Sequence, residues 1–225
     1  MKVALIGQGS NGECIRQWLE RRQVSIIGSA DTVPDIYILL ATGRELVEQA
    51  QRLPANDRPV FHTDGLQSKD LLQNASHYGI LWPLQFGTGE RSPTLVLDAS
   101  SATALQLLHR LAAALGATTA VMGQEERRRM HLAAIVAIHF TDHLRALAQD
   151  FCASEGMDFE LLRPAIGSAA LNRAHRPAEY SRQFEGFGDP SIVNRHLALL
   201  EMHPYLKRLY LRFTNSSMGW AAPAR

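Results

Sequence analysis

The feature that most constrains this chain lies at its start, where an apolar strand leads directly into the pattern G-x-G-x-x-G. The run Val3–Ile6 is followed by Gly7, Gly9 and Gly12. In a strand–turn–helix unit the first glycine permits the tight turn, the second leaves room for a phosphate, and the third lets the helix pack close to the sheet. Amides at the start of the helix attract an anion. The pattern therefore predicts a phosphate-binding turn.

The surroundings favour a dinucleotide over a glycine turn that serves packing alone. A helix is expected over 11–22, and Asp31 follows a second apolar run at 24–29. An acid at this place usually binds the ribose 2′-hydroxyl of NAD and repels the 2′-phosphate of NADP. No Arg or Lys follows to hold that phosphate, so the residues favour NAD. The alternative is that Asp31 only begins a turn.

The residues expected to hold the cofactor form one set. The glycines would contact the pyrophosphate, neighbouring residues would add donors, and a threonine after the third strand would approach the nicotinamide. The set comprises Gly7, Gln8, Gly9, Ser10, Asn11, Gly12, Asp31 and Thr42.

The order of apolar segments divides the chain after residue 122. Strands are expected at 2–7, 24–29, 36–41, 59–63, 79–82, 94–98 and 118–122, and helices between them at 11–22, 43–52, 66–75 and 101–115. This alternation is typical of an α/β domain with a mostly parallel sheet covered on both faces. Only helices are expected afterwards, at 124–155, 158–174, 190–201 and 204–216. We therefore predict a Rossmann-like domain at 1–122 and an all-helical domain at 123–225.

The first domain is shorter than a complete dinucleotide-binding fold. Only residues 30–35 separate the second and third strands, whereas a crossover between adjacent parallel strands needs about a dozen residues. Six extended residues span about 20 Å, enough to return along a strand without a helix. We expect the strands at 24–29 and 36–41 to flank the first strand on opposite sides.

Composition limits the possible partners and compartments. A net charge of +1 gives no electrostatic reason to expect binding to nucleic acid or an anionic membrane. No apolar run has membrane-spanning length, and the first strand does not resemble a signal peptide. Cys14 and Cys152 lack metal-ligand spacing and are typical of buried thiols in the cytoplasm.

Five motifs follow one another in a fixed order over nearly the whole chain. They are Val60–Gly65, Trp82–Phe86, Gln124–His143, Asn194–Leu200 and Pro204–Tyr210. They resemble a bacterial family with a Rossmann-like domain and a C-terminal helical domain of unknown function. Its members are labelled NADP oxidoreductases, deazaflavin-dependent-oxidoreductase-like or 6-phosphogluconate-dehydrogenase-like proteins. The resemblance implies NADP as cofactor, a small-molecule substrate in a cleft between the domains, and a homodimer formed through a 6-phosphogluconate dehydrogenase C-terminal-like domain.

The chain departs from that family at positions that bear on chemistry. The family's His-Thr-Ser-Gly is here His62-Thr-Asp-Gly65, and its asparagine on the long helix is His139. Hydroxyacid and 6-phosphogluconate dehydrogenases carry a lysine four residues before that asparagine, where this chain has Ile135. Alcohol oxidation through that lysine is therefore not expected. Imine reduction needs no such lysine, because the cofactor carries the hydride.

Two histidines are candidates for the catalytic site. His62 ends a predicted strand at the edge where open α/β sheets bind ligands, and an imidazole can transfer a proton near neutral pH. The alternative is a turn, since Thr63–Gly65 has good turn chemistry. His131 lies at the centre of the long-helix motif. It can share a helix side with His139 and His143. A further ligand would have to come from elsewhere, such as His109 or His196, and nothing demands it, so no metal is expected.

A charged cluster, Glu125–Arg129, begins the long helix. Acids near a helix start interact favourably with its dipole, and most of the cluster is expected to form a solvated face. One arginine could bind a phosphate or carboxylate, and Arg128 shares the side of His131.

Together these residues predict an NAD(P)-dependent oxidoreductase that reduces an imine or a carbonyl of a small molecule. The alternative is a non-catalytic nucleotide- or partner-binding protein that keeps the fold. The shortened first domain and the missing lysine favour that alternative.

Overall fold

The structure is a computed structural model that describes residues 1–27, 33–53, 57–84, 93–173 and 189–219. Contacts divide the chain into two compact units, Met1–Ile138 and His139–Arg225. The assignment of domains to 1–122 and 123–225 stays a prediction.

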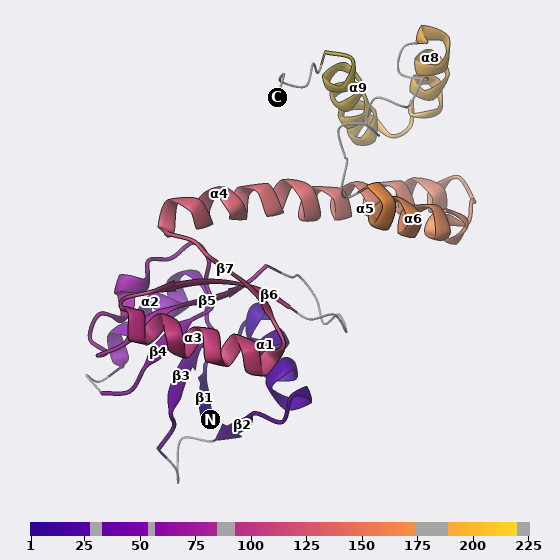
Figure 1. Ribbon diagram of the computed structural model, residues 1–225. Coiled ribbons are helices and arrows are strands. Elements are labelled where there is room, and N and C mark those ends of the chain that lie inside the picture. The colour runs from indigo at the N-terminus through magenta and orange to yellow at the C-terminus, as the bar shows by residue number, and fades with distance from the viewer. Residues whose placement is uncertain (28–32, 54–56, 85–92, 174–188, 220–225) are drawn as a thin grey trace. The chain divides into compact units, whose positions relative to one another are not determined.

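The described residues of the first unit form a seven-stranded sheet in the order β2-β1-β3-β4-β5-β6-β7 (Figure 1). The strands are β1 (Lys2–Ile6), β2 (Ser25–Ile27), β3 (Ile36–Leu39), β4 (Val60–His62), β5 (Tyr78–Pro83), β6 (Thr94–Ala99) and β7 (Thr118–Val121). Neighbouring strands are parallel except β5 and β6. Only ten residues, 84–93, join these two strands in the sequence, fewer than the dozen or more that a crossover between parallel strands needs. The mostly parallel α/β fold is therefore confirmed.

The shortened connection after β2 has the predicted effect on strand order. Val3 of β1 pairs with Ile26 of β2 on one side and with Ile36 of β3 on the other. The expected flanking of the first strand is thus confirmed. Asp31 lies outside the described residues.

Helices cover both faces of the sheet. Helices α1 (Ser10–Arg21) and α3 (Ala102–Leu115) lie along one face (Figure 1), and α2 (Gly43–Arg52) lies on the other. Side chains of β3 alternate between the two cores, with Ile38 in the first and Leu39 in the second. Burial on both faces explains why the central strands read as continuous apolar runs.

The prediction of a helix at 66–75 was wrong. The described segment holds only the four-residue 3₁₀ helix η1 (Lys69–Leu72). Asp64 accepts hydrogen bonds from the amides of Leu66 and Gln67, and Ser68 accepts one from Asp70. Such local side-chain bonds offer the backbone an alternative to a regular helix.

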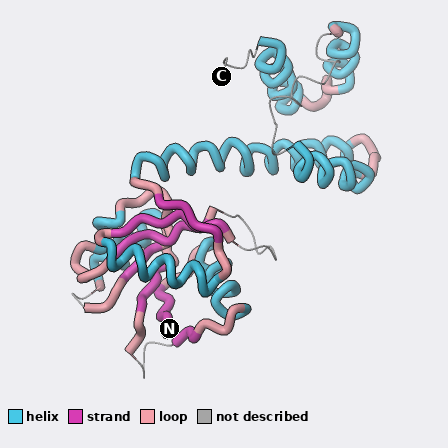
Figure 2. Tube along the Cα trace, in the orientation of Figure 1, coloured by secondary structure: helices cyan, strands magenta, loops and turns pink. Residues whose placement is uncertain are grey.

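After β7 the described residues form helices joined by loops, with no further strand among them (Figure 2). They are α4 (Gln124–Ala134), the π-helical segment η2 (Ile135–His139), α5 (Phe140–Ser154), the 3₁₀ helix η3 (Phe159–Leu162), α6 (Arg163–Arg173), α8 (Pro190–Leu199) and α9 (Pro204–Gly219). The helix predicted at 124–155 therefore has a π-helical interruption. None of the helices in the described part of the chain is both long and apolar enough to cross a membrane.

Candidate functional site

The glycine turn joins β1 to α1 and lies at the carboxyl end of the central strands. Gly7 has φ +83°, in the left-handed region that glycine adopts at low cost. A Cβ on Gly9 would lie 2.4 Å from the backbone oxygen of Leu40, and a Cβ on Gly12 would lie 2.7 Å from the Leu40 Cβ. Both glycines therefore allow α1 to approach the end of β3.

A pocket of about 420 Å³ opens beside this turn. Its walls come from the turn, from one side of α1 and from the residue that follows β3. The lining residues are Gly7, Gln8, Gly9, Gly12, Glu13, Arg16 and Leu40. Because β2 and β3 lie on opposite sides of β1, the strand order reverses at this point. Open α/β sheets bind ligands outside the carboxyl ends of their strands at such a reversal.

Seven of the eight predicted cofactor residues, all but Asp31, belong to the described residues and fall into three groups. Four of them, Gly7, Gln8, Gly9 and Gly12, line the pocket. Ser10 and Asn11 belong to the first turn of α1, where backbone amides have no acceptor within the helix. Thr42 is exposed at the start of α2, outside the pocket lining.

Two charged residues of the pocket, Glu13 and Arg16, were missed by the sequence reasoning. The Glu13 carboxylate accepts a hydrogen bond of 2.9 Å from Gln17 Nε2. The Arg16 side chain is half-buried. Helix periodicity could have found both, because Glu13 follows Gly9 by four residues and Arg16 follows Gly12 by four.

His62 is the last residue of β4 and is fully buried. Its Nδ1 accepts a hydrogen bond of 3.2 Å from the Asp64 amide, and its Nε2 lies 3.2 Å from the Ser68 carbonyl oxygen. These partners place the ring proton on Nε2. Burial lowers the pKa of His62 from 6.5 to about 4, although the Ser68 hydrogen bond and the Asp64 charge oppose the shift. The imidazole is therefore neutral at pH 7, and its catalytic role stays a prediction.

Asp64 connects the loop after β4 to the start of α2. Its Oδ2 accepts a hydrogen bond of 2.8 Å from the Gly43 amide, and its Oδ1 accepts one of 2.8 Å from Leu66. Gly43 has φ +57° and begins α2 directly after Thr42. The carboxylate thereby fixes the turn that carries the predicted nicotinamide contact.

Arg127 is fully buried, contrary to the solvated face expected for most of Glu125–Arg129. Its guanidinium forms an ion pair with Asp98 of β6, whose other oxygen lies 2.9 Å from Lys69 Nζ. The guanidinium also donates to the backbone carbonyls of Gly65, Gln67 and Met122. Arg127 therefore holds the loop after β4 to β6 and to the beginning of α4.

His131 lies on α4 against Trp82 near the end of β5. The two rings are stacked, with centroids 5.8 Å apart and planes at 28°. A Cβ on Gly65 would lie 2.4 Å from the Trp82 ring, so the loop after β4 also rests on the indole. His131 is thus placed beside the carboxyl ends of β4 and β5, and its catalytic role stays a prediction.

Among the described residues, no cluster of three or more His, Cys, Asp or Glu side chains could hold a metal ion. Cys14 and Cys152 are buried thiols.

The sheet, the glycine turn and the helices after β7 define a Rossmann-like protein with a helical C-terminal part. The chain belongs to the family described as "Domain of unknown function (DUF2520)", which matches residues 94–217. A search of the curated proteins found no match to the chain.

Solved structures with this fold cover nearly all of the chain. A Bacteroides fragilis protein provisionally named an NADP oxidoreductase has a TM-score of 0.83 and 20% identity over 96% of this chain and 97% of its own. The 1-pyrroline-5-carboxylate reductase of Streptococcus pyogenes has a TM-score of 0.63 and 13% identity, covering 98% and 99%. An imine reductase from Myxococcus stipitatus, solved with NADP⁺, has a TM-score of 0.58 and 17% identity, covering 97% and 94%. At these identities the likeness shows the fold alone.

Proposed function

We propose that this protein is an NAD(P)-dependent oxidoreductase that reduces a small molecule. The observation that carries the proposal is the pocket at the glycine turn, which lies where the strand order reverses. The first-turn amides of α1, the helix dipole and the Arg16 side chain suit the negative charge of a pyrophosphate. The names of the similar structures support the same activity.

In this proposal the chain binds and orients, and the bound cofactor supplies the hydride. Gly7, Gly9 and Gly12 hold the pyrophosphate against the start of α1, and Thr42 borders the nicotinamide. His131 lies on the substrate side and is our candidate for transferring a proton.

The positions of the lysines favour the reduction of an imine, because neither alcohol oxidation nor its reverse, carbonyl reduction, has the lysine that hydroxyacid dehydrogenases use. The chain has three lysines. Lys69 is held by Asp98, Lys207 pairs with Glu201 in the second unit, and Lys2 stands at the amino end of β1, the opposite edge from the pocket. None of them lines the pocket.

NADP is the cofactor that the names of the similar structures favour, and NAD is the one that Asp31 favours. We keep both as proposals.

We also propose that the second unit forms a homodimer, because Leu161, Leu199 and Met202 are between 65% and 86% exposed there. Sedimentation velocity should then give a mass twice that of the chain, and a monomer at micromolar concentration would exclude this part of the proposal.

A nucleotide-binding protein without catalysis is the second candidate. The burial of His62 and its neutral state at pH 7 are compatible with it, because the imidazole is enclosed by the loop after β4.

Thermal unfolding with NADPH and NADH in separate samples tests the proposal. A ligand that binds only the folded state raises the melting temperature. At a ligand concentration one hundred times its Kd, the free energy of unfolding increases by about 2.7 kcal/mol. We expect a rise with at least one of them, followed by loss of NADPH absorbance when a cyclic imine is added. Binding without turnover of any imine or ketone would favour the second candidate, and no thermal shift with either would exclude both.

A further inference from the structure

We infer that Arg16 is a phosphate-binding residue of the glycine pocket and that it works with Glu13 to select a diphosphate attached to a sugar. This inference rests on the proposed function and adds two residues that the glycine pattern does not contain. It concerns the ligand's phosphate and ribose groups, which can be tested separately from any reaction.

The pocket extends from the glycine turn along one side of α1. Glu13 follows Gly9 by four residues, and Arg16 follows Gly12 by four and Glu13 by three, so the four residues lie toward one side of α1, and all line the pocket. Arg16 follows Gly12 by four residues, about 6 Å along the axis. Because helical side chains point toward the amino terminus, the long Arg16 side chain leads back toward the glycine turn.

The described lining of the pocket carries one residue of each charge. Among the described residues that line the pocket, Arg16 is the only cation and Glu13 the only anion. Glu13 is engaged by Gln17 through a 2.9 Å hydrogen bond. Within the described residues, no ion pair is found between the two or from Arg16 to another acid. The guanidinium is therefore available for a bidentate interaction with phosphate oxygens.

The presence of Glu13 narrows the class of ligand. A carboxylate beside the phosphate site repels an anion that consists of phosphate alone. The same carboxylate can accept hydrogen bonds from sugar hydroxyls, since an ionised carboxylate only accepts. A ligand that places its diphosphate at Arg16 and its ribose at Glu13 satisfies both residues, whereas inorganic pyrophosphate satisfies only Arg16.

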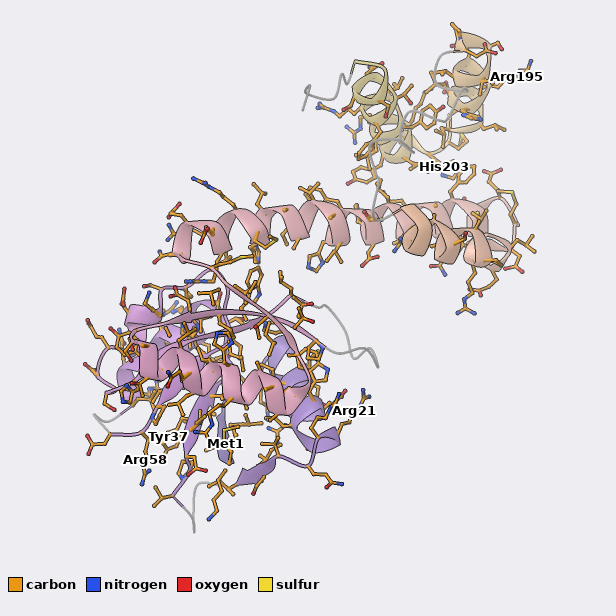
Figure 3. The ribbon with its side chains drawn as sticks, viewed as in Figure 1. Met1, Arg21, Tyr37, Arg58, Arg195 and His203 are labelled. Carbon is orange, nitrogen blue, oxygen red and sulfur yellow. The ribbon has the colours of Figure 1, made fainter. Side chains whose placement is uncertain are left out.

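The variant Arg16→Gln tests the role of the guanidinium. Glycine variants are poor tests, because a Cβ on Gly9 would collide with the Leu40 carbonyl whether or not a phosphate binds. Arg21→Gln is the matched control, since Arg21 is exposed in the last turn of the same helix, outside the pocket lining (Figure 3). Calorimetric titrations would use NADPH, NADH, ADP-ribose and inorganic pyrophosphate.

We expect Arg16→Gln to weaken the binding of NADPH, NADH and ADP-ribose by about 10- to 100-fold, the usual effect of losing a charge-assisted hydrogen bond. Arg16→Lys should retain part of the affinity, and Arg21→Gln should change it by less than about 3-fold. Glu13→Gln should weaken ADP-ribose and strengthen inorganic pyrophosphate, because it removes an acceptor and a repulsive charge together.

The outcomes separate this inference from the proposed function. Equal cofactor affinity of the wild-type, Arg16→Gln and Arg16→Lys proteins would overturn the inference and leave the proposed function standing. Arg16-dependent binding of ADP-ribose without binding of either dinucleotide would overturn the proposed function and support the inference. Binding of none of the four ligands by the wild-type protein would overturn both.

Discussion

Replacing Arg127 by Met should destabilise the first unit strongly, although the substitution lies in a run of surface charges in the sequence. Arg127 has no exposed surface and forms an ion pair with Asp98. Removing one partner of a buried pair typically costs about 3–5 kcal/mol, because the remaining charge stays buried. Lys69 still lies 2.9 Å from Asp98 and keeps part of that charge compensated, so we expect the lower end, about 3 kcal/mol.

Urea unfolding followed by tryptophan fluorescence would measure this loss, because Trp18 and Trp82 are buried in the first unit. Arg128→Met is the matched control. Its side chain is 50% exposed and pairs with Glu125, which is 69% exposed, so its loss should cost less than about 1 kcal/mol. The double variant Arg127→Met with Asp98→Asn should cost less than the sum of the single changes. If Arg127→Met lowers the free energy of unfolding no more than Arg128→Met does, the stabilising role assigned to the buried Arg127–Asp98 ion pair is refuted.

Two further predictions concern the loop after β4. Folding lowers the pKa of His62 from 6.5 to about 4. Between these two pH values the unfolded chain binds a proton at His62 that the folded state does not bind. The free energy of unfolding should therefore fall by about 3 kcal/mol from pH 7 to pH 4. His62→Gln should show a smaller fall in the same urea titrations, and an unchanged pH dependence would contradict the assignment. Gly65→Ala should cost about 1–3 kcal/mol and alter the Trp82 fluorescence, since its Cβ would meet the indole. At Gly123 the nearest atom is Glu126 Oε2 at 3.7 Å, so Gly123→Ala should cost only the loss of a better N-cap residue, less than about 1 kcal/mol. Equal effects of the two substitutions would contradict the packing argument.

The sequence could predict those features that depend on neighbouring residues. The glycine turn follows from residues 3–12, and the position of β1 between β2 and β3 follows from the length of a single connection. The position of Arg16 in the pocket could also have been predicted, because it follows Gly12 by four residues and therefore lies on the same side of α1.

Features that depend on distant partners could not be predicted. Arg127 and Arg128 are adjacent and chemically alike, yet one is buried and the other exposed. The difference arises from Asp98 and the Gly65 carbonyl, which lie 29 and 62 residues away in the chain. Likewise, the neutral state of His62 depends on its burial.

Calorimetric titration of the wild-type protein with NADPH and with NADH tests the central claim most directly, namely that the pocket at the glycine turn holds a dinucleotide. We predict saturable binding of at least one of them at one site per chain, with an affinity that falls as salt is added because phosphate charges contribute to it. No binding heat with either compound at millimolar concentration, from a protein shown to be folded by its urea transition, would contradict the claim.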